Sequence, residues 1–266
     1  MFFLILSLVS LSLVFLVYFL YYVLIYGAKD KITKYLENLN QVLKTKAKSL
    51  PNISVIISTY EEAKVIRRKL KNIADSDYPL DKMEIIVVDD ASRDDTSEIA
   101  GSSFTEFGLN GRVLRNSQRI GLNASLNIAI KAASNDVICI TDSDVTFEKS
   151  ALGNVISVLE GMEGVGGVTG NIVPSFDDNN RVTRLEQGYR SFSNRSMLAE
   201  SFRHSGFPGS GVLTVFRRSA LSSTIPVSYG STDGTLSMSI IKGGCRFLYL
   251  PYADVYEPVP EDVGQH

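Results

Sequence analysis

Four short β-branched runs, each followed by a helical stretch, limit the fold of this chain more than any other feature of its sequence. Strands that alternate with helices in this way form a parallel sheet covered by crossover helices. The run VICI at 137–140 is apolar throughout, as expected for a strand buried on both faces. We therefore predict an α/β fold with a Rossmann-like, mainly parallel sheet flanked by helices. The predicted pairs are Ile53–Ser58 with 61–75, Glu84–Asp89 with 94–107, Arg112–Leu114 with 121–133, and Asp136–Thr141 with 149–160.

The first 28 residues carry no charge and are mostly large and apolar. As a helix, residues 1–26 would measure about 39 Å, more than the roughly 30 Å hydrocarbon core of a bilayer. A signal peptide would need a basic start, a shorter apolar core and a small-residue cleavage site, and the sequence has none of these. We therefore expect one transmembrane helix over residues 1–28, which would anchor the chain in the cell membrane and contact membrane lipid.

Residues 29–50 form a basic juxtamembrane segment with six lysines and two carboxylates, a net charge of +4. By the positive-inside rule, the domain that follows, residues 51–266, is expected in the cytoplasm. Apolar residues in the segment recur at helical spacing and predict a helix that rests on the membrane or links two parts in solvent. The sequence does not separate these two readings. The apolar positions are Ile32, Tyr35, Leu36, Leu39 and Leu43.

Charge and cysteine content exclude several classes of protein. The formal net charge is −2, which argues against a nucleic-acid-binding protein, whose basic face would raise the total. The two cysteines, Cys139 and Cys245, are far apart in the sequence and stand without other metal-ligand residues. A zinc site or a disulfide scaffold is therefore not expected.

Polar residues follow three of the predicted strands. Tyr60 follows the first, Asp89 and Asp90 end the second, and Asp142 and Asp144 follow the fourth. Open parallel sheets bind ligands at this carboxyl edge, and carboxylates gathered there repel one another unless a cation neutralises them. The first strand is followed by neither a Gly-x-Gly-x-x-Gly loop nor a Walker lysine loop, which disfavours dinucleotide and P-loop enzymes.

The sharpest single motif is Asp142-Ser143-Asp144, directly after the fourth strand. Side chains alternate along an extended chain, so the two carboxylates lie on one side. Such a pair can hold Mg²⁺ or Mn²⁺ and leave coordination positions for phosphates. Alternatively, Asp144 caps the turn or helix that follows.

Six sequence blocks over residues 51–262 together resemble the family 2 inverting glycosyltransferases. This resemblance implies the nucleotide-sugar-binding glycosyltransferase A fold. The blocks, in order, are ISVIISTYEEAKVIRRKLKNI, EIIVVDDASRDDT, QRIGLNASLNIAI, ICITDSDV, GSGVLTVFRRSAL and STDGTLSMSIIKGGCRFLYLPYADVYE.

The resemblance implies a nucleotide pocket at the ends of the first two strands. Tyr60 and Glu62 would line it, with Tyr60 packed on the base. Asp90 would hydrogen-bond the base, whereas Asp89 would have a structural role. Arg119 would lie near the diphosphate. The alternative for Tyr60 is a half-buried aromatic side chain at a strand end, and the alternative for Arg119 is a surface arginine.

The same resemblance implies the reacting groups. Asp142 would approach the ribose and the metal, Asp144 would be the principal ligand of Mn²⁺ or Mg²⁺, and Asp233 would be the catalytic base. A carboxylate can take the proton of an attacking hydroxyl, and a metal can stabilise the charge that grows on the departing diphosphate. The alternative for Asp233 is the N-cap of a helix that includes 236–241.

Three departures from the family pattern stand out. Thr232 precedes Asp233 where the family usually has Glu, and Leu122 and Asn123 stand where many relatives have a Lys. The Gln-x-x-Arg-Trp block of processive members does not occur before His266. The enzyme is thus expected to be non-processive, or the chain to be truncated.

These observations predict a metal-dependent inverting glycosyltransferase at the cytoplasmic membrane face. It would move sugar from a nucleotide-diphosphate sugar to a hydroxyl of a lipid-linked glycan or polysaccharide. A polyprenyl phosphate acceptor and a catalytically silent nucleotide-sugar- or glycan-binding membrane protein are the alternatives. A nucleotidylyltransferase is disfavoured because STYEE, after the first strand, is acidic instead of basic and Gly-rich.

Overall fold

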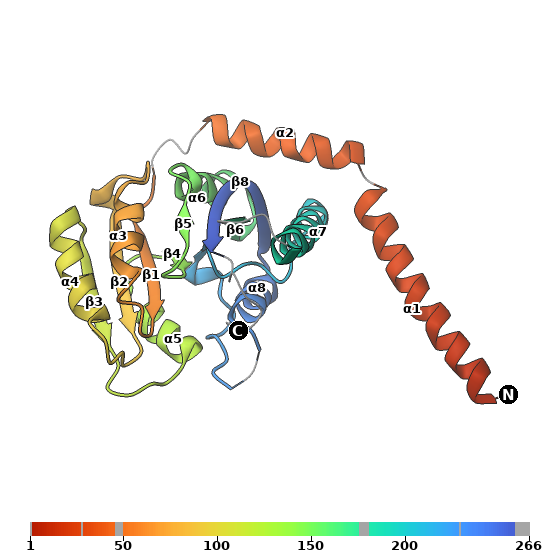
Figure 1. The fold of residues 1–266 in the computed structure, drawn as a ribbon. Coiled ribbons are helices and arrows are strands. Elements are labelled where there is room, and N and C mark those ends of the chain that lie inside the picture. Colours follow the sequence, from red (N-terminus) through yellow and green to blue (C-terminus); the bar gives the residue numbers. More distant parts are fainter. Residues whose placement is uncertain (1, 28, 46–49, 176–180, 229, 259–266) are drawn as a thin grey trace.

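The computed structural model describes residues 2–27, 29–45, 50–175, 181–228 and 230–258. In these residues one sheet has the strand order β3-β2-β1-β4-β7-β6-β8-β5 (Figure 1). The strands are β1 Ile53–Thr59, β2 Met83–Asp89, β3 Gly111–Arg115, β4 Val137–Thr141, β5 Thr146–Phe147, β6 Val165–Ser175, β7 Thr214–Arg217 and β8 Arg246–Pro258. Lys46, Lys48 and residues 259–266, which belong to the predicted basic segment and catalytic domain, lie outside the described residues.

Helices cover both faces of the sheet and include all four that the alternation predicts. Short 3-10 turns lie at Leu80–Lys82 and Arg218–Ala220. The helices are α1 Phe2–Tyr26, α2 Lys29–Thr45, α3 Ile66–Ala74, α4 Thr96–Phe107, α5 Leu122–Ala132, α6 Ala151–Gly161, α7 Arg181–Arg203 and α8 Thr232–Lys242.

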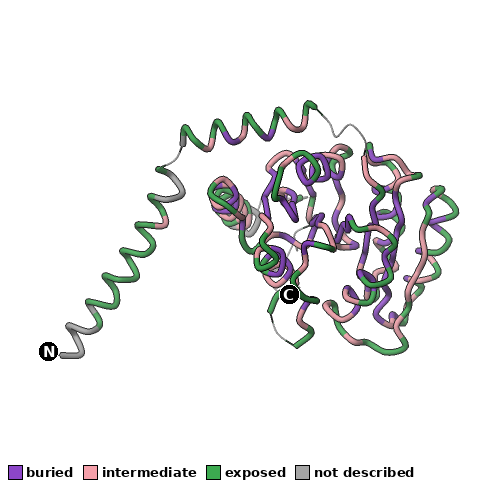
Figure 2. The backbone as a smooth tube through the Cα atoms, turned by 180° about the vertical axis from the view of Figure 1, so that it is seen from behind, coloured by how far each residue is buried: buried purple, intermediate pink, exposed green. Residues whose placement is uncertain are grey.

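The first half of the sheet is parallel, as predicted. Strand β1 pairs in parallel with β2 and β4, and β2 pairs in parallel with β3. Side chains of β1 alternate between two cores: Val55 and Ile57 pack with α3, α4 and α6, and Ile56 packs with α5 and α8. Figure 2 shows this buried interior in purple. The carboxyl ends of the four parallel strands therefore meet at one edge.

The second half of the sheet is mixed, so the prediction of a mainly parallel sheet is wrong there. Strand β7 runs antiparallel to β4 and β6, β5 runs antiparallel to β8, and β6 and β8 are parallel. Parallel neighbours need a crossover that returns the chain to the opposite edge of the sheet. Helix α7 and the loop after it instead bring the chain back to the edge at which β6 ends.

Helix α2 packs its apolar face on the domain. Tyr35 and Leu39 are buried in the same core as α3, α4 and α6. The Tyr35 ring meets Phe202 of α7 edge-on, with ring centroids 6.0 Å apart, and Asn40 Nδ2 donates to the Tyr252 hydroxyl at 3.1 Å. The apolar spacing in this segment thus reflects a helix that covers part of the core.

In the described part of the chain, no helix combines the length and the apolar character that crossing a bilayer requires. The predicted transmembrane helix over residues 1–28 is therefore wrong. The predicted localisation, a cell-membrane protein with a single-pass anchor and a cytoplasmic catalytic domain, is wrong with it. Within α1, the Tyr21 hydroxyl donates to Glu200 Oε1 of α7 at 3.0 Å.

Candidate functional site

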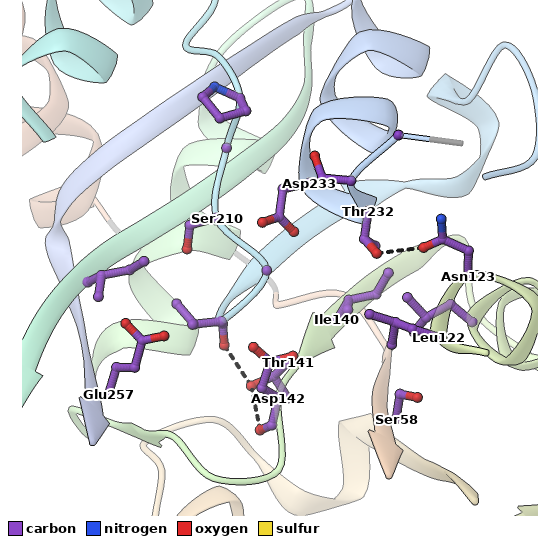
Figure 3. A pocket seen from close by; sticks show the side chains of 18 of the residues that line it. Ser58, Leu122, Asn123, Ile140, Thr141, Asp142, Ser210, Thr232, Asp233 and Glu257 are labelled. Atoms are coloured by element: carbon purple, nitrogen blue, oxygen red, sulfur yellow. Dashed lines mark hydrogen bonds between the residues drawn. The ribbon is translucent and has the colours of Figure 1, made fainter. Parts of the chain in front are cut away.

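A cavity of about 700 Å³ opens at the carboxyl ends of β1 and β4 (Figure 3). It extends from Ser58 and Asp142 at these strand ends to the start of α5 and the first turn of α8. Helix α7 and the loop at 208–212 close its other side. The parallel half of the sheet and the mixed half therefore both contribute walls.

Three carboxylates from different elements face this cavity: Asp142 after β4, Asp233 in α8 and Glu257 in β8 (Figure 3). Burial, and then the nearby charges of Asp144 and Asp233, raise the pKa of Asp142 to about 6. Burial also raises the pKa of Glu257, although the Arg190 guanidinium, 2.8 Å from its Oε2, opposes the rise. The cavity thus carries a surplus of partly desolvated negative charge.

Asp233 lies in the first turn of α8 but does not cap it. The cap is Ser231, whose Oγ accepts a hydrogen bond from the Gly234 N–H at 3.2 Å. Burial raises the pKa of Asp233, and a hydrogen bond from the backbone N–H of Gly211 opposes this. Because another residue caps the helix, the Asp233 carboxylate remains free to face the cavity.

Thr232 and Asn123, two residues at which the sequence departs from the family pattern, contact each other. Thr232 Oγ1 donates to Asn123 Oδ1 at 2.5 Å (Figure 3). Asn123 Nδ2 donates to the Pro226 carbonyl at 2.7 Å. These bonds tie the start of α5 to the start of α8. The departures at 123 and 232 are therefore one structural feature.

Tyr60 and Arg119 come together after β1 and are not among the residues that line the cavity. The Arg119 guanidinium carbon lies 3.8 Å from the centroid of the Tyr60 ring, a cation–π contact. Neighbouring Glu62 is partly buried, and burial followed by the charges of Asp144 and Asp94 raises its pKa. The structure thus brings Glu62 near the Asp142–Asp144 turn and stacks the predicted diphosphate arginine, Arg119, on Tyr60.

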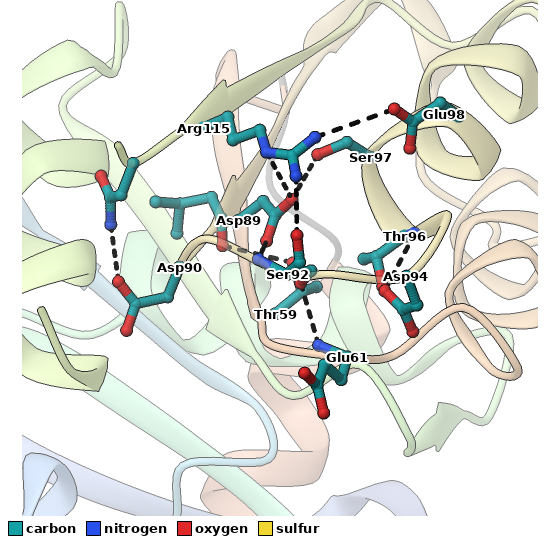
Figure 4. A network of polar contacts seen from close by, with 12 residues as sticks. Thr59, Glu61, Asp89, Asp90, Ser92, Asp94, Thr96, Ser97, Glu98 and Arg115 are labelled. Atoms are coloured by element: carbon teal, nitrogen blue, oxygen red, sulfur yellow. Dashed lines mark hydrogen bonds and ion pairs between the residues drawn. The ribbon is translucent and has the colours of Figure 1, made fainter. Parts of the chain in front are cut away.

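Backbone hydrogen bonds hold the loop after β1 against the loop after β2 (Figure 4). The N–H of Glu61 donates to Ser92 Oγ at 2.9 Å, and the N–H of Glu62 donates to Thr96 Oγ1 at 2.8 Å. Glu61 has a φ of 58°, a left-handed conformation that is uncommon outside glycine. These contacts fix where Tyr60 and Glu62 emerge from the sheet.

Asp90 and Asp89 both organise loops. Asp90 accepts hydrogen bonds from the backbone N–H groups of Ile120 and Gly121 at 2.9 and 2.8 Å, so it anchors the loop that carries Arg119. Asp89 is fully buried and accepts from the Ser92 N–H at 2.8 Å and from the Ser97 hydroxyl (Figure 4). The structural role expected for Asp89 agrees with these contacts, and base binding by Asp90 stays a prediction.

Asp142 and Asp144 are the residues that could hold a divalent cation. Among the residues that the structure describes, no three His, Cys, Asp or Glu side chains are gathered as a complete metal site. The charge of Asp144 raises the pKa of Asp142 in a desolvated setting, an excess of negative charge that a cation would neutralise. Two carboxylates with phosphate oxygens in the remaining positions suit Mg²⁺ or Mn²⁺, so the donor set fits the ion.

Sequence reasoning missed four residues of this region: Lys69, Arg190, Gly211 and Glu257. Lys69 had a visible signal, because it interrupts the apolar face that Ile66, Leu70 and Ile73 form on α3. The others are recognisable only once β8, α7 and the 208–212 loop are folded around the cavity.

The chain resembles several curated glycosyltransferases. The probable glycosyltransferase YdaM of Bacillus subtilis is 32% identical over 171 residues, which cover 61% of this chain and 39% of that protein. The poly-β-1,6-N-acetyl-D-glucosamine synthase of Staphylococcus aureus is 27% identical over 239 residues, which cover 85% of this chain and 55% of that protein. The chain therefore spans only about two fifths to just over half of the length of these relatives.

Solved structures show the same fold. A mannosyltransferase of Pyrobaculum calidifontis, in complex with GDP-Man and Mn²⁺, superposes with a TM-score of 0.70 at 28% identity, covering 91% of this chain and 69% of that one. TarS of S. aureus with UDP-GlcNAc has a TM-score of 0.60 at 19% identity, covering 79% and 59%, which supports the fold alone. The profile described as glycosyl transferase family 2 matches residues 54–224. Because this match covers more than half of the sequence, the chain belongs to glycosyl transferase family 2.

Proposed function

We propose that the chain is a metal-dependent inverting glycosyltransferase that transfers a sugar from a nucleotide-diphosphate sugar to an acceptor hydroxyl. The acceptor would be a glycan, either a polysaccharide or a lipid-linked glycan. The observation that carries this proposal is that Asp142, beside its partner Asp144, and Asp233 face one cavity from opposite walls. A metal-bound donor and a base for the acceptor can therefore meet there.

On the donor side, Tyr60, Glu62 and Arg119 are proposed to bind the nucleotide. The Tyr60 face that now contacts Arg119 is a flat apolar surface of the kind on which a base stacks. If this contact opened, the Arg119 guanidinium could turn toward the diphosphate. Asp90 would limit how far Arg119 can move, because it anchors the 116–121 loop. Asp142 and Asp144 would hold the metal, which supplies Lewis-acid stabilisation of the diphosphate.

On the acceptor side, Asp233 is proposed to take the proton from the attacking hydroxyl. Its raised pKa makes it a stronger base than an exposed aspartate, and the Gly211 N–H keeps its carboxylate oriented. Attack from the Asp233 wall, opposite the departing diphosphate, inverts the anomeric carbon. Glu257 is less suited to this role because its carboxylate already pairs with Arg190 at 2.8 Å.

The test is a transfer assay with the purified chain, Mn²⁺ or Mg²⁺, and a panel of UDP- and GDP-sugars with oligosaccharide acceptors. Proton NMR of the first product reports the anomeric configuration. We expect transfer with inversion, loss of activity with EDTA, and loss in Asp142→Asn. Asp75→Asn, an exposed aspartate at the end of α3, is the matched control and should stay active.

Other outcomes would separate the alternatives. Transfer to a polyprenyl phosphate but to no hydroxyl would replace the proposed acceptor. Retention of configuration would contradict the inverting mechanism. Tight binding of a donor with no transfer to any acceptor would favour a catalytically silent binding protein.

A further inference from the structure

Lys69 is a charged side chain with no exposed surface, in the middle of α3. Its Nζ donates to Thr141 Oγ1 at 2.7 Å and to the Val145 carbonyl at 3.2 Å. The same atom lies 3.8 Å from the centroid of the Phe147 ring. The three N–H groups of the ammonium thus have two oxygen acceptors and an aromatic face.

Burying an ammonium group opposes folding unless its partners compensate for the lost water. Burial lowers the pKa of Lys69 to about 7, and the nearby carboxylates of Asp142 and Asp144 oppose this fall. Its helix neighbours Ile66, Leu70 and Ile73 are apolar and fully buried, so an apolar residue would suit this position for packing alone. The lysine therefore has a role that packing does not explain.

The partners of Lys69 lie on both sides of the Asp142–Asp144 turn. Thr141 precedes the turn and Val145 follows it, so the ammonium group of Lys69 links the two ends of the turn. Two further residues of α3 hold the same segment: Arg68 Nη2 donates to the Asp144 carbonyl at 3.0 Å, and Asn72 exchanges hydrogen bonds with the backbone of Phe147 at 2.7 and 2.9 Å.

Thr141 carries the contact across the site. Its Oγ1 accepts from Lys69 and donates to the Val212 carbonyl at 2.7 Å. The residue before Val212 is Gly211, which stands directly against the Asp233 carboxylate: a Cβ atom at position 211 would lie 2.7 Å from Asp233 Oδ1. A continuous route therefore joins the buried lysine, the Asp142–Asp144 turn and the loop that orients Asp233.

We propose that Lys69 is a positioning residue that fixes the Asp142–Asp144 turn and, through Thr141, the 210–213 loop beside Asp233. The inference rests on the proposed function for its catalytic consequence, but its structural claim is testable without any substrate. Lys69 touches neither donor nor acceptor in this scheme and acts only through the backbone and Thr141.

The test compares Lys69→Met with Lys71→Met, an exposed lysine on the same helix that pairs with Asp75. Hydrogen exchange of the ligand-free protein should become faster in peptides covering 141–147 and 210–213 of Lys69→Met, and stay unchanged in Lys71→Met. Mn²⁺ affinity in the presence of UDP or GDP should weaken by roughly 10- to 100-fold, as for other residues that orient metal ligands. Nucleotide affinity without metal should not change.

A second pair of variants keeps the test decisive if Lys69→Met does not fold. Thr141→Val keeps the shape of the side chain but removes both hydrogen bonds, whereas Thr141→Ser keeps the hydroxyl. We expect faster exchange at 210–213 and a lower kcat in Thr141→Val, with recovery in Thr141→Ser.

If Lys69→Met folds and its hydrogen exchange at 141–147 and 210–213 is unchanged, the inference is overturned. If Lys69→Met does not fold, unchanged exchange in Thr141→Val overturns it. Wild-type protein that binds neither Mn²⁺ nor nucleotide would instead contradict the proposed function. The exchange comparison would still decide the positioning role in that case.

Discussion

Gly211 stands directly against Asp233: a Cβ atom at position 211 would lie 2.7 Å from Asp233 Oδ1. Real Cβ atoms essentially never come so close to another heavy atom, so a side chain here must displace the carboxylate. The glycine therefore allows the backbone N–H to reach Asp233 without a steric conflict.

Gly211→Ala should leave the fold intact and lower kcat by roughly 10²-fold, the effect of a misplacement of about 1 Å in a catalytic geometry. Donor affinity should change little, because Asp233 acts on the acceptor. Steady-state kinetics and calorimetric donor binding measure the two effects. Gly101→Ala in α4, where a Cβ meets nothing within 4 Å, is the control and should retain activity. Wild-type kcat in Gly211→Ala would contradict the proposed alignment.

Asp233→Asn keeps the size of the side chain but cannot accept the proton of the acceptor. We expect kcat to fall by roughly 10²–10⁴-fold, the contribution typical of a general base. In the wild type, kcat/KM should fall as the pH drops through the pKa of Asp233, which burial places above the ordinary aspartate value. The pH–rate profile of the variant should lose this acidic limb. An unchanged profile would assign the limb to another group.

Glu84 should make stability depend on pH in acid. Burial by itself would raise the pKa of this carboxyl group. Hydrogen bonds from Ser54, Ser134 and Arg112 outweigh the effect of burial and lower the pKa to about 2. Between about pH 4.5 and 2 the unfolded chain binds more protons, so this contribution is present above that range and is lost as the pH falls through it.

The contribution from Glu84 is of the order of 3 kcal/mol. Urea unfolding at several pH values should show Glu84→Gln less stable than the wild type at pH 7, with the difference shrinking toward pH 2. Glu106→Gln, which removes an exposed carboxylate paired with Arg67, should change stability by less than about 1 kcal/mol. A pH-independent difference in Glu84→Gln would rule out this linkage.

The parallel half of the fold is predictable from sequence because β1, β2 and β4 are mostly apolar and helices alternate with its strands. Strand β6 is not, because its glycines hide the strand pattern. A Cβ at Gly166 would lie 2.5 Å from Cys245 Cβ, and one at Gly167 would lie 2.7 Å from the Phe247 ring. Close packing between segments far apart in the chain selects these glycines, and a local pattern does not contain that information.

The candidate site divides in the same way. Tyr60, Asp90 and Asp142 are recognisable because they follow apolar strands at a shared edge. Lys69 and Glu257 gain meaning only from tertiary contacts: Lys69 from the turn that it closes, and Glu257 from the mixed half of the sheet. At the N-terminus the sequence predicted too much instead of too little. The apolar composition of residues 1–28 predicted a membrane span, which the described helices contradict.

Asp144→Asn tests the metal assignment most directly. The substitution removes one ligand charge and hardly changes volume, so the fold should persist while transfer falls sharply. Binding of UDP or GDP should lose its dependence on Mn²⁺, because Asp142 and Asp144 together would hold the ion, and the ion would offset the charge of the diphosphate. Calorimetric titrations with and without Mn²⁺ measure this difference, and Asp75→Asn, at a residue that does not line the cavity, should keep it. Metal-dependent binding of wild-type strength in Asp144→Asn would move the metal away from the Asp142–Asp144 turn.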